Sequence, residues 1–435
     1  MAATSRVPGF KDRTVEERRR IVTEHTRIPR GDLAALDPAA GLSLAQADHM
    51  IENVVGTIGI PVGVATNFTV NGRDRLVPMA TEEPSVVAAA SNAARMARDH
   101  GGFRTSSTGS VMIAQIQLVD VVDPYAARAR ILESTAEIAA LADAQDPMLR
   151  SLGGGVRGVD ARVVDTRAGR HVIVHLTVDV RDAMGANAVN TMAEAVAPRL
   201  AELGAGRALL RILSNKADLR LTRARAVFDA QQLGGPAVVD GIVQASALAE
   251  ADPYRAATHN KGIMNGVTAV VLATGNDTRA VEAGCHSHAV QNGRYSALSR
   301  FEKDATGNLV GTLELPLAVG LVGGATRAHP AARVAIAILG VATATELADV
   351  IASVGLAQNL AACRALAAEG IQRGHMSLHA RTIAASAGAG PDEIAAVAAR
   401  LVADRQIRAE HAERVLRGLR GEGDPAAPAA GTALS

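Results

Sequence analysis

A lysine among small polar residues is the first group in this chain that is suited to chemistry. Lys261 lies in the run from Asp252 to Gly266, together with a second cation, Arg255. This composition is typical of a site rather than of a hydrophobic core. A lysine held by tight backbone can stabilise an oxyanion on a substrate carbonyl, and a nearby arginine can bind a carboxylate through its planar guanidinium.

Two further polar runs supply acids that could act with this lysine. Glu83 lies in Glu82-Glu83-Pro84-Ser85, just before an alanine-rich helical stretch, and Asp277 ends the turn-like run 273–277, which follows an apolar, strand-like segment. A lysine and two carboxylates in contact perturb one another's pKa values, which can keep a glutamate protonated near neutral pH as a general acid. The alternative is that the three runs are unrelated surface turns.

The composition limits the class of protein. A chain of 435 residues is long enough for two or three domains, and 45 Lys and Arg against 44 Asp and Glu give no overall field toward nucleic acid or a membrane surface. Two cysteines, Cys285 and Cys363, are too few for a disulfide framework or a cysteine zinc site. We expect a cytoplasmic protein without a membrane partner, because the charged N-terminus lacks the apolar core of a secretory signal.

Residues 110–214 show a regular change of periodicity that predicts one domain. Strand-like and helical patterns alternate in the order β-α-β-β-α-β, at 111–121, 125–144, 157–165, 171–180, 188–203 and 208–213. This order is the signature of a ferredoxin-like domain. The expected fold class is therefore α+β.

The flanking segments, 1–109 and 215–374, are expected to form a larger mixed domain into which the small one is inserted. Helical stretches are expected at 86–98 and 343–368. A helical appendage at 375–420, joined through the glycines at 370 and 374, could move as a flap, and the Ala, Pro and Gly rich tail 421–435 is expected to be disordered.

Two glycine-containing motifs have different contexts. The run Gly153 to Gly158 matches G-x-G-x-x-G, but it follows a helix and opens a strand, which argues against a Rossmann loop. The run Asp182 to Asn187 follows a strand and precedes a helix, where backbone amides suit a phosphate. An ordinary strand-to-helix turn is the alternative for this second run.

The histidines allow a metal or an acid role. His375 and His379 are four residues apart, and His286 and His288 are two apart, but the glutamate of a zincin motif is missing. A simpler interpretation makes His375, at the root of the expected flap, a proton donor that arrives when the flap closes, with a packing histidine as the alternative. We therefore expect no metal.

Several runs, taken in order, resemble those of hydroxymethylglutaryl-CoA (HMG-CoA) reductase, specifically the soluble bacterial class II form. The likeness extends from about Pro8 to about Gly418. The matching runs are 52–56, 71–74 (Asn-Gly-Arg-Asp), 82–85, 182–187, 252–266, 273–277 and 370–376. The resemblance implies a large domain, an inserted ferredoxin-like dinucleotide domain, a mobile C-terminal flap and a homodimer, possibly assembled further, with the active site at the interface.

The resemblance also implies a reaction and four catalytic residues. HMG-CoA and mevalonate plus CoA would be interconverted by two hydride transfers. Lys261 would polarise the thioester carbonyl, and Glu83 would donate a proton when the aldehyde is reduced. Asp277 would maintain the charge state of this pair, and His375 would protonate the departing CoA thiolate, for which an imidazolium is acidic enough.

Binding residues follow from the same resemblance. Arg255, Ser85 and Asn359 would hold the substrate carboxylate, and Lys11, where an arginine is expected, would meet the phosphates of CoA. Asp182, Met184, Gly185 and Asn187 would lie along the dinucleotide, and Asn215 would lie near its nicotinamide end. Asp146 would bond the adenine ribose and repel the extra phosphate of NADP, so the expected cofactor is NAD(H).

Other functions remain open from the residues alone. A reductase of another carboxylated acyl-CoA would share these groups, and Arg255 separates it from a reductase of plain acyl chains. A zinc-dependent hydrolase built on the four histidines predicts a chelator-sensitive activity. A silent binding protein would not require Glu83, Lys261, Asp277 and His375 together.

Overall fold

The computed structural model describes residues 4–26, 28–37, 41–368 and 371–421, and it leaves the side chains of 371–378 undescribed. Most of the two segments that flank the small domain form a large body around a six-stranded sheet, with the strand order β11-β12-β8-β3-β1-β2. Its strands are β1 (Val62–Val70), β2 (Arg73–Ala80), β3 (Phe103–Ser107), β8 (Leu221–Phe228), β11 (Ser299–Lys303) and β12 (Leu309–Pro316). β1 and β3 are parallel at a single pair, Val70 and Phe103, and the other pairings are antiparallel.

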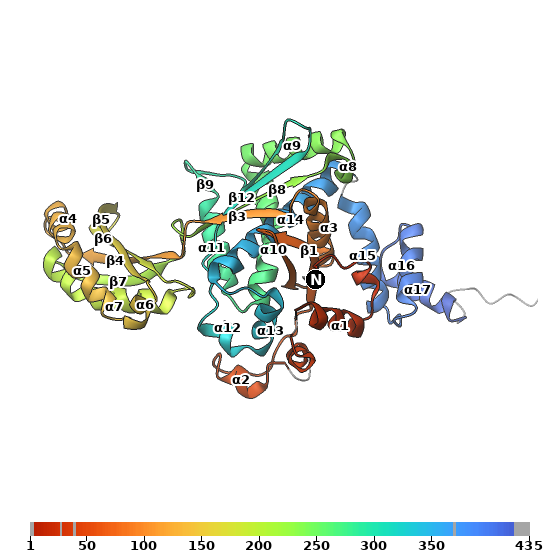
Figure 1. Ribbon diagram of the computed structural model, residues 1–435, viewed down its shortest axis with the longest axis horizontal. Helices are drawn as coiled ribbons and strands as arrows, with labels where there is room; N and C mark the ends of the chain where they lie inside the picture. Colours follow the sequence, from red (N-terminus) through yellow and green to blue (C-terminus); the bar gives the residue numbers. More distant parts are fainter. Residues whose placement is uncertain (1–3, 27, 38–40, 369–370, 422–435) are drawn as a thin grey trace, which may run out of the picture.

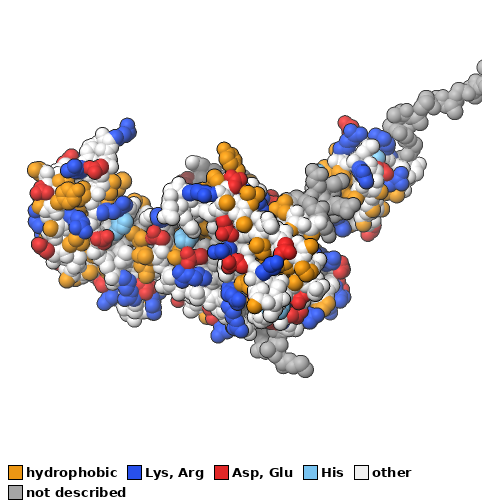
Figure 2. All heavy atoms as spheres, turned by 90° about the horizontal axis from the view of Figure 1, so that it is seen from above, with side chains coloured by type: hydrophobic (Ala, Val, Ile, Leu, Met, Phe, Trp, Pro, Cys, Tyr) orange, Lys and Arg blue, Asp and Glu red, His pale blue; other side chains and the backbone are white. Residues whose placement is uncertain are grey.

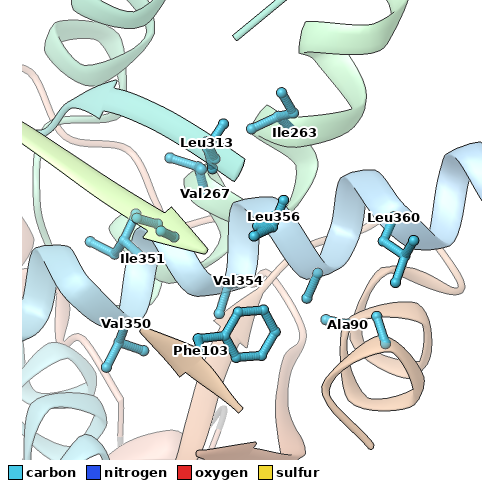
Figure 3. Packing of buried hydrophobic residues seen from close by; sticks show 14 of the residues in the cluster. Ala90, Phe103, Ile263, Val267, Leu313, Val350, Ile351, Val354, Leu356 and Leu360 are labelled. Atoms are coloured by element: carbon cyan, nitrogen blue, oxygen red, sulfur yellow. The ribbon is translucent and has the colours of Figure 1, made fainter. Parts of the chain in front are cut away.

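Long helices complete the core of this body. They are α3 (Val86–Arg98), α9 (Pro236–Ala251), α10 (Pro253–Ala273) and α14 (Ala344–Ala368). Figure 3 shows α14 in the middle of the core, with Ile351 near Leu313 and Val267 on one side and Val350 and Val354 near Phe103 on the other. The alanine-rich stretches that predict α3 and α14 are confirmed almost to the residue.

Glycines allow α10 and α14 to cross closely. A Cβ on Gly266 would lie 2.9 Å from the Cβ of Gln358, and one on Gly355 would lie 2.9 Å from a methyl group of Val267. Any side chain at either position would therefore push the helices apart. The helix α10 also corrects an expectation, because the apolar segment before residue 273 is the last part of a helix and not a strand.

The small domain, at the left of Figure 1, confirms the β-α-β-β-α-β order. Its sheet has the strand order β5-β6-β4-β7. The elements are β4 (Val111–Val119), α4 (Pro124–Glu133), α5 (Thr135–Asp143), α6 (Pro147–Ser151), β5 (Gly155–Thr166), β6 (Gly169–Asp179), α7 (Ala186–Gly204) and β7 (Arg207–Ser214). A separate buried cluster that includes Ile116, Ile131, Leu176 and Val196 packs the helices α4, α5 and α7 onto the sheet.

The C-terminal helices pack on one another around a third buried cluster, which includes Ala384, Leu401 and Leu416. They are α15 (Ile371–Ser386), α16 (Ile394–Ala403) and α17 (Ala409–Leu419). Figure 2 shows this unit as a lobe at the upper right of the body, opposite the small domain. The helix α15 includes Gly374, so the joint expected at 370–374 is in part helical, and the tail 422–435 lies outside the described residues.

Shorter elements cover the edges of the large body. They are η1 (Phe10–Asp12), α1 (Val15–Thr26), η2 (Arg30–Leu36), α2 (Leu44–Asp48), α8 (Ala230–Leu233), α11 (Thr278–His288), β9 (Val290–Gln291), β10 (Arg294–Tyr295), α12 (Gly324–Ala328) and α13 (Pro330–Leu339). On the face shown in Figure 2, basic and acidic side chains are interspersed. Within the described ranges α14 is the one helix with the length and hydropathy of a membrane span, and 67% of that window is buried inside the protein.

Candidate active site

Lys261 and Glu83 meet although 178 residues separate them in the chain. The Nζ of Lys261 donates to Oε2 of Glu83 at 2.9 Å, and the amide of Asn265 reaches both glutamate oxygens at 3.3 and 3.4 Å. Lys261 and Asn265 are four residues apart on α10, so they occupy one face of the helix. The side chains of Lys261 and Glu83 are 61% and 36% exposed, which leaves the pair accessible.

Sequence reasoning missed Asn265, because the run 252–266 was not identified as a helix. Its spacing of four residues from Lys261 is the signal that could have found it. The helix itself begins at Asp252, whose carboxylate accepts the backbone N–H groups of Tyr254 and Arg255 at 3.3 Å. Such a cap satisfies the free amides of the first turn and fixes where α10 starts.

Asp277 is engaged differently from the expectation. Its Oδ1 accepts the backbone N–H groups of Arg279 and Ala280 at 2.9 and 3.1 Å, so it caps the start of α11. Among the described residues no hydrogen bond joins Asp277 to Lys261. The structure therefore brings together two of the three expected charges within one chain.

Glu83, the acid of this pair, lines two cavities. The larger, of about 1530 Å³, is lined by Glu83, Ser85, Asn265 and the exposed Lys11 of η1. The smaller, of about 500 Å³, also has Glu83 and Asn265 in its wall, together with Thr278 and Glu282. Glu83 and Asn265 thus face both spaces.

Ser85 has a backbone conformation that marks it as unusual. Its φ is 78°, in the left-handed region, and its hydroxyl does not cap α3, which starts at the next residue. A strained non-glycine residue at the wall of a cavity is the kind of outlier found at binding sites. The serine predicted for carboxylate binding therefore lies in a suitable place.

A buried hydrogen-bond network is formed around His259, two residues before Lys261 on α10. Nε2 of His259 is 2.6 Å from Oγ of Ser299, which donates to Oδ1 of Asn359 at 2.7 Å, and Nδ1 of His259 is 3.8 Å from Sγ of Cys363. Burial and, to a lesser degree, repulsion from Arg255 lower the pKa of His259 to about 4. The imidazole is therefore neutral at physiological pH.

Asn359, one of the residues expected to bind the substrate, belongs to this buried network. Asn359 is only 1% exposed, and its amide also donates to the carbonyl of His259 at 3.4 Å. Both ends of the amide are thus used inside the protein. In this arrangement Asn359 supports α10 from inside the protein, whereas the family resemblance implies contact with the substrate. Arg255, one turn before His259 on α10, is half-buried.

The run 182–187 forms the expected turn between β6 and α7. Gly185 has φ 104°, and a Cβ there would lie 2.7 Å from a methyl group of Val180, so the turn requires glycine. Gly185 gives α7 no side-chain cap, which leaves the first amides of a 19-residue helix for an anion. Met184 is half-buried and Asn187 is exposed. One oxygen of Asp182 accepts the backbone N–H of Ala344 at 2.8 Å.

The other two expected dinucleotide residues adjoin the two outer strands of the small domain's sheet, Asp146 on the side of β5 and Asn215 on the side of β7. Asp146 caps the short helix α6 through Oδ1, which accepts the N–H of Leu149 at 2.8 Å. Asn215 is an exposed residue between β7 and β8, and a Cβ on Gly284 of α11 would lie 3.0 Å from its carbonyl oxygen. Asn215 thus packs against α11, the helix that begins just after the turn 274–277, called here the Asp277 turn.

The histidines proposed as metal ligands are distributed differently. His286 bonds Glu282 at 2.9 Å and Tyr295 at 2.7 Å, and His288 bonds Glu314 at 3.1 Å. His375 is in α15 but its side chain lies outside the described residues, whereas His379 is exposed. Over the parts of the chain that the structure describes, no group of three or more His, Cys, Asp or Glu side chains could hold a metal ion.

Comparisons with known proteins agree on one family. Residues 14–380 match the family described as "Hydroxymethylglutaryl-coenzyme A reductase". A 3-hydroxy-3-methylglutaryl-coenzyme A reductase of Archaeoglobus fulgidus is 56% identical, over 96% of both chains. A probable reductase of the same name from Borreliella burgdorferi is 37% identical over 77% of both chains.

Solved structures give the same result. The 3-hydroxy-3-methylglutaryl-coenzyme A reductase of Streptococcus pneumoniae superposes with a TM-score of 0.81 at 40% identity, covering 95% of this chain and 99% of its own. A class II enzyme of the same organism, bound to NADPH in open conformations, gives 0.79 at 40% identity and covers 94% and 100%.

Proposed function

The chain belongs to the hydroxymethylglutaryl-coenzyme A reductase family, and from that premise we propose which residues carry its reaction and which cofactor it uses. The activity interconverts HMG-CoA and mevalonate plus CoA. A nicotinamide dinucleotide, when bound, supplies the two hydrides. The observation that carries the assignment of roles is the contact of Lys261 with Glu83, a residue that lines a large cavity.

In the direction of reduction, the ammonium of Lys261 stabilises the oxyanion that forms when the thioester carbonyl receives the first hydride. The carbon–sulfur bond then breaks, and the CoA thiolate takes a proton from His375. Glu83 donates a proton to the aldehyde oxygen as the second hydride arrives. Asn265, which bonds both oxygens of Glu83, orients this carboxyl group.

Arg255 and Ser85 are proposed to hold the distal carboxylate of the substrate. A guanidinium has a geometric reason to be there only if the substrate carries such a group. Asn359 supports α10 through His259 and Ser299 instead of touching the ligand. Lys11, exposed at the wall of the large cavity, is suited to a phosphate of CoA as a point charge.

NAD(H) is the proposed cofactor. The uncapped start of α7 fits a pyrophosphate, and the carboxylate of Asp146 disfavours the extra phosphate of NADP. Arg150, one turn after Asp146, is turned toward Asp143, with Nε 3.3 Å from Oδ2. If Asp146 is the discriminating group, Asp146→Asn should improve the use of NADPH relative to NADH by roughly tenfold.

A homodimer is proposed as the working unit. The segment 51–61 has no helix or strand, and the side chains of Ile51, Val55 and Ile58 are strongly exposed. A run of exposed apolar residues beside a site is typical of a surface covered by another subunit. Light scattering should give twice the chain mass, and Val55→Asp with Ile58→Asp should lower both the mass and the activity.

The first experiment measures NADH and NADPH oxidation by the purified protein with HMG-CoA, with and without chelator. Rapid, chelator-insensitive oxidation of NADH supports both the reaction and the cofactor. Preference for NADPH would overturn the Asp146 argument alone. Chelator-sensitive release of CoA without oxidation of either dinucleotide would favour the zinc hydrolase alternative. Oxidation with a different carboxylated acyl-CoA but not with HMG-CoA would change the substrate.

A further inference from the structure

Arg220 is a buried cation that the reaction described above does not use. It lies between the small domain and β8, is 4% exposed, and forms no ion pair within 4 Å among the described residues. Burial lowers its pKa to about 10, against the opposing effect of Asp179 and Asp182, so it stays charged at neutral pH. A buried charge of this kind is costly unless hydrogen bonds compensate it.

Backbone carbonyl groups of two different segments provide that compensation. Nη1 of Arg220 donates to the carbonyls of Ala183 and Met184 at 3.1 and 3.2 Å, and Nη2 donates to the carbonyl of Val319. The first two belong to the turn between β6 and α7, and the third belongs to the segment after β12 of the large body. One guanidinium therefore joins the small domain to the large one, through charge-assisted bonds.

The same two segments are in contact beyond the arginine. A Cβ on Gly320 would lie 2.4 Å from the backbone N of Met184, and the N–H of Leu321 donates to the carbonyl of Asp182 at 2.8 Å. The N–H of Gly320 also donates to Oδ1 of Asn276 at 2.8 Å, one residue before Asp277. Hydrogen bonds thus connect Arg220, through these segments, to the Asp277 turn.

We propose that Arg220 is a positioning residue, which holds the turn 182–187 at a fixed distance from the Asp277 turn and so sets the place of the bound dinucleotide relative to Lys261 and Glu83. The role of the turn rests on the proposed function. Arg220 does not touch the reactants in this arrangement. It acts through the turn, whose amides and Met184 are proposed to face the cofactor.

Two substitutions test the contact from its two sides. Arg220→Lys keeps the charge but cannot reach three carbonyls at once. Gly320→Ala leaves the arginine intact and places a methyl group against Met184, which displaces the same turn. Arg223→Met is the matched control, because Arg223 lies three residues further along the chain, on β8, is half exposed, and its side chain bonds Glu314 at 2.6 Å and no other described residue.

Both test variants should raise the KM for the dinucleotide and lower kcat, each on the order of tenfold, because small errors in hydride geometry are costly. The KM for HMG-CoA should stay unchanged. Reduction of HMG-CoA and of free mevaldehyde should be slowed equally, since both use the hydride. The isotope effect with 4-deuterated dinucleotide should increase, and Arg223→Met should match the wild type in every respect.

Hydrogen exchange of the amides 182–187 is the readout that does not depend on activity. It should become faster in Arg220→Lys and in Gly320→Ala, and not in Arg223→Met. Unchanged exchange, or a lower melting temperature with normal dinucleotide KM and isotope effect, would overturn the proposal and make Arg220 a structural residue only. If exchange becomes faster in both variants but the wild-type protein oxidises no dinucleotide with HMG-CoA, the proposed function is wrong, whereas the contact made by Arg220 is as described.

Discussion

The ammonium of Lys261 and the carboxylate of Glu83 are joined at 2.9 Å by a hydrogen bond between α10 and the segment that precedes α3. The lysine comes from the middle of a helix whose buried face is fixed by α14, while the glutamate comes from a short turn. The rigid partner is thus the one that we propose for the substrate oxyanion, and a rigid mount favours a preorganised charge.

Lys261→Ala should lower kcat by a factor on the order of 10² to 10³, because the oxyanion loses its main stabilising charge. Steady-state rates with HMG-CoA measure the loss, and circular dichroism checks the fold. Lys303→Ala removes an exposed lysine that pairs with Asp240 and should leave the rate unchanged. A near-normal rate for Lys261→Ala would remove the mechanism.

His375→Ala should slow the reduction of HMG-CoA more than that of free mevaldehyde, because only the thioester releases a thiolate that needs a proton. His379→Ala, one turn further on α15 and exposed, is the control. Equal losses on the two substrates would show that His375 is not the acid of the thiolate.

Acid should destabilise the fold through His259. Its pKa in the folded protein, about 4, is below the unfolded value near 6.5, so the neutral form is favoured by folding. The associated stability is complete above pH 6.5 and is lost as the pH falls toward 4, with a total of about 3 kcal/mol. Denaturant titrations at pH 7 and 4.5 should show a smaller difference for His259→Gln than for the wild type, and His49→Gln should behave as the wild type.

Asp74→Asn should weaken HMG-CoA binding. Oδ2 of Asp74 accepts the backbone N–H of Ser5 at 2.8 Å and a bond from Arg98, which fastens the segment that leads to Lys11. Although burial raises it, hydrogen bonds from Arg98, Ser5 and Thr69 lower the pKa of Asp74 to about 2. The charged form therefore stabilises the fold above pH 3.8 and this contribution is lost as the pH falls toward 2.

The KM for HMG-CoA should rise several-fold in Asp74→Asn while that for mevaldehyde, which lacks CoA, should not change. Asp165→Asn, which removes an exposed acid paired with Arg170, is the control. An equal rise for both substrates would mean that Asp74 acts on the whole fold rather than on the CoA segment.

Periodicity predicted those parts of the fold in which side chains alternate or repeat regularly. The small domain and α3 and α14 are examples, because their buried residues follow a period of two or of about 3.6. The helix α10 was not predicted. Gly262 and Gly266 interrupt the helical pattern of the run 252–266, and the apolar last part of the helix was misread as a strand. Gly266 is there because α14 passes too close for a side chain, which is a property of the pair of helices and not of the local sequence.

The site was predictable to a smaller extent. Residue types suggested that Lys261 and Glu83 do chemistry, but their contact depends on how α10 packs beside the segment before α3, so only the family resemblance could place them together. The burial of Asn359 and the link through Arg220 were not predictable, since both depend on which carbonyl and hydroxyl groups the fold leaves unpaired.

The close crossing of α10 and α14 has a meaning beyond packing. One helix carries Lys261, and the other leads through residues 369–370 to the helix that holds His375. The absence of a side chain at Gly266 therefore sets the distance between α10 and α14. On the proposed mechanism, this distance affects where Lys261 and His375 lie relative to the two atoms of the carbon–sulfur bond that breaks. A single methyl group added at Gly266 would increase the separation of the two helices and would change no residue that is proposed to react.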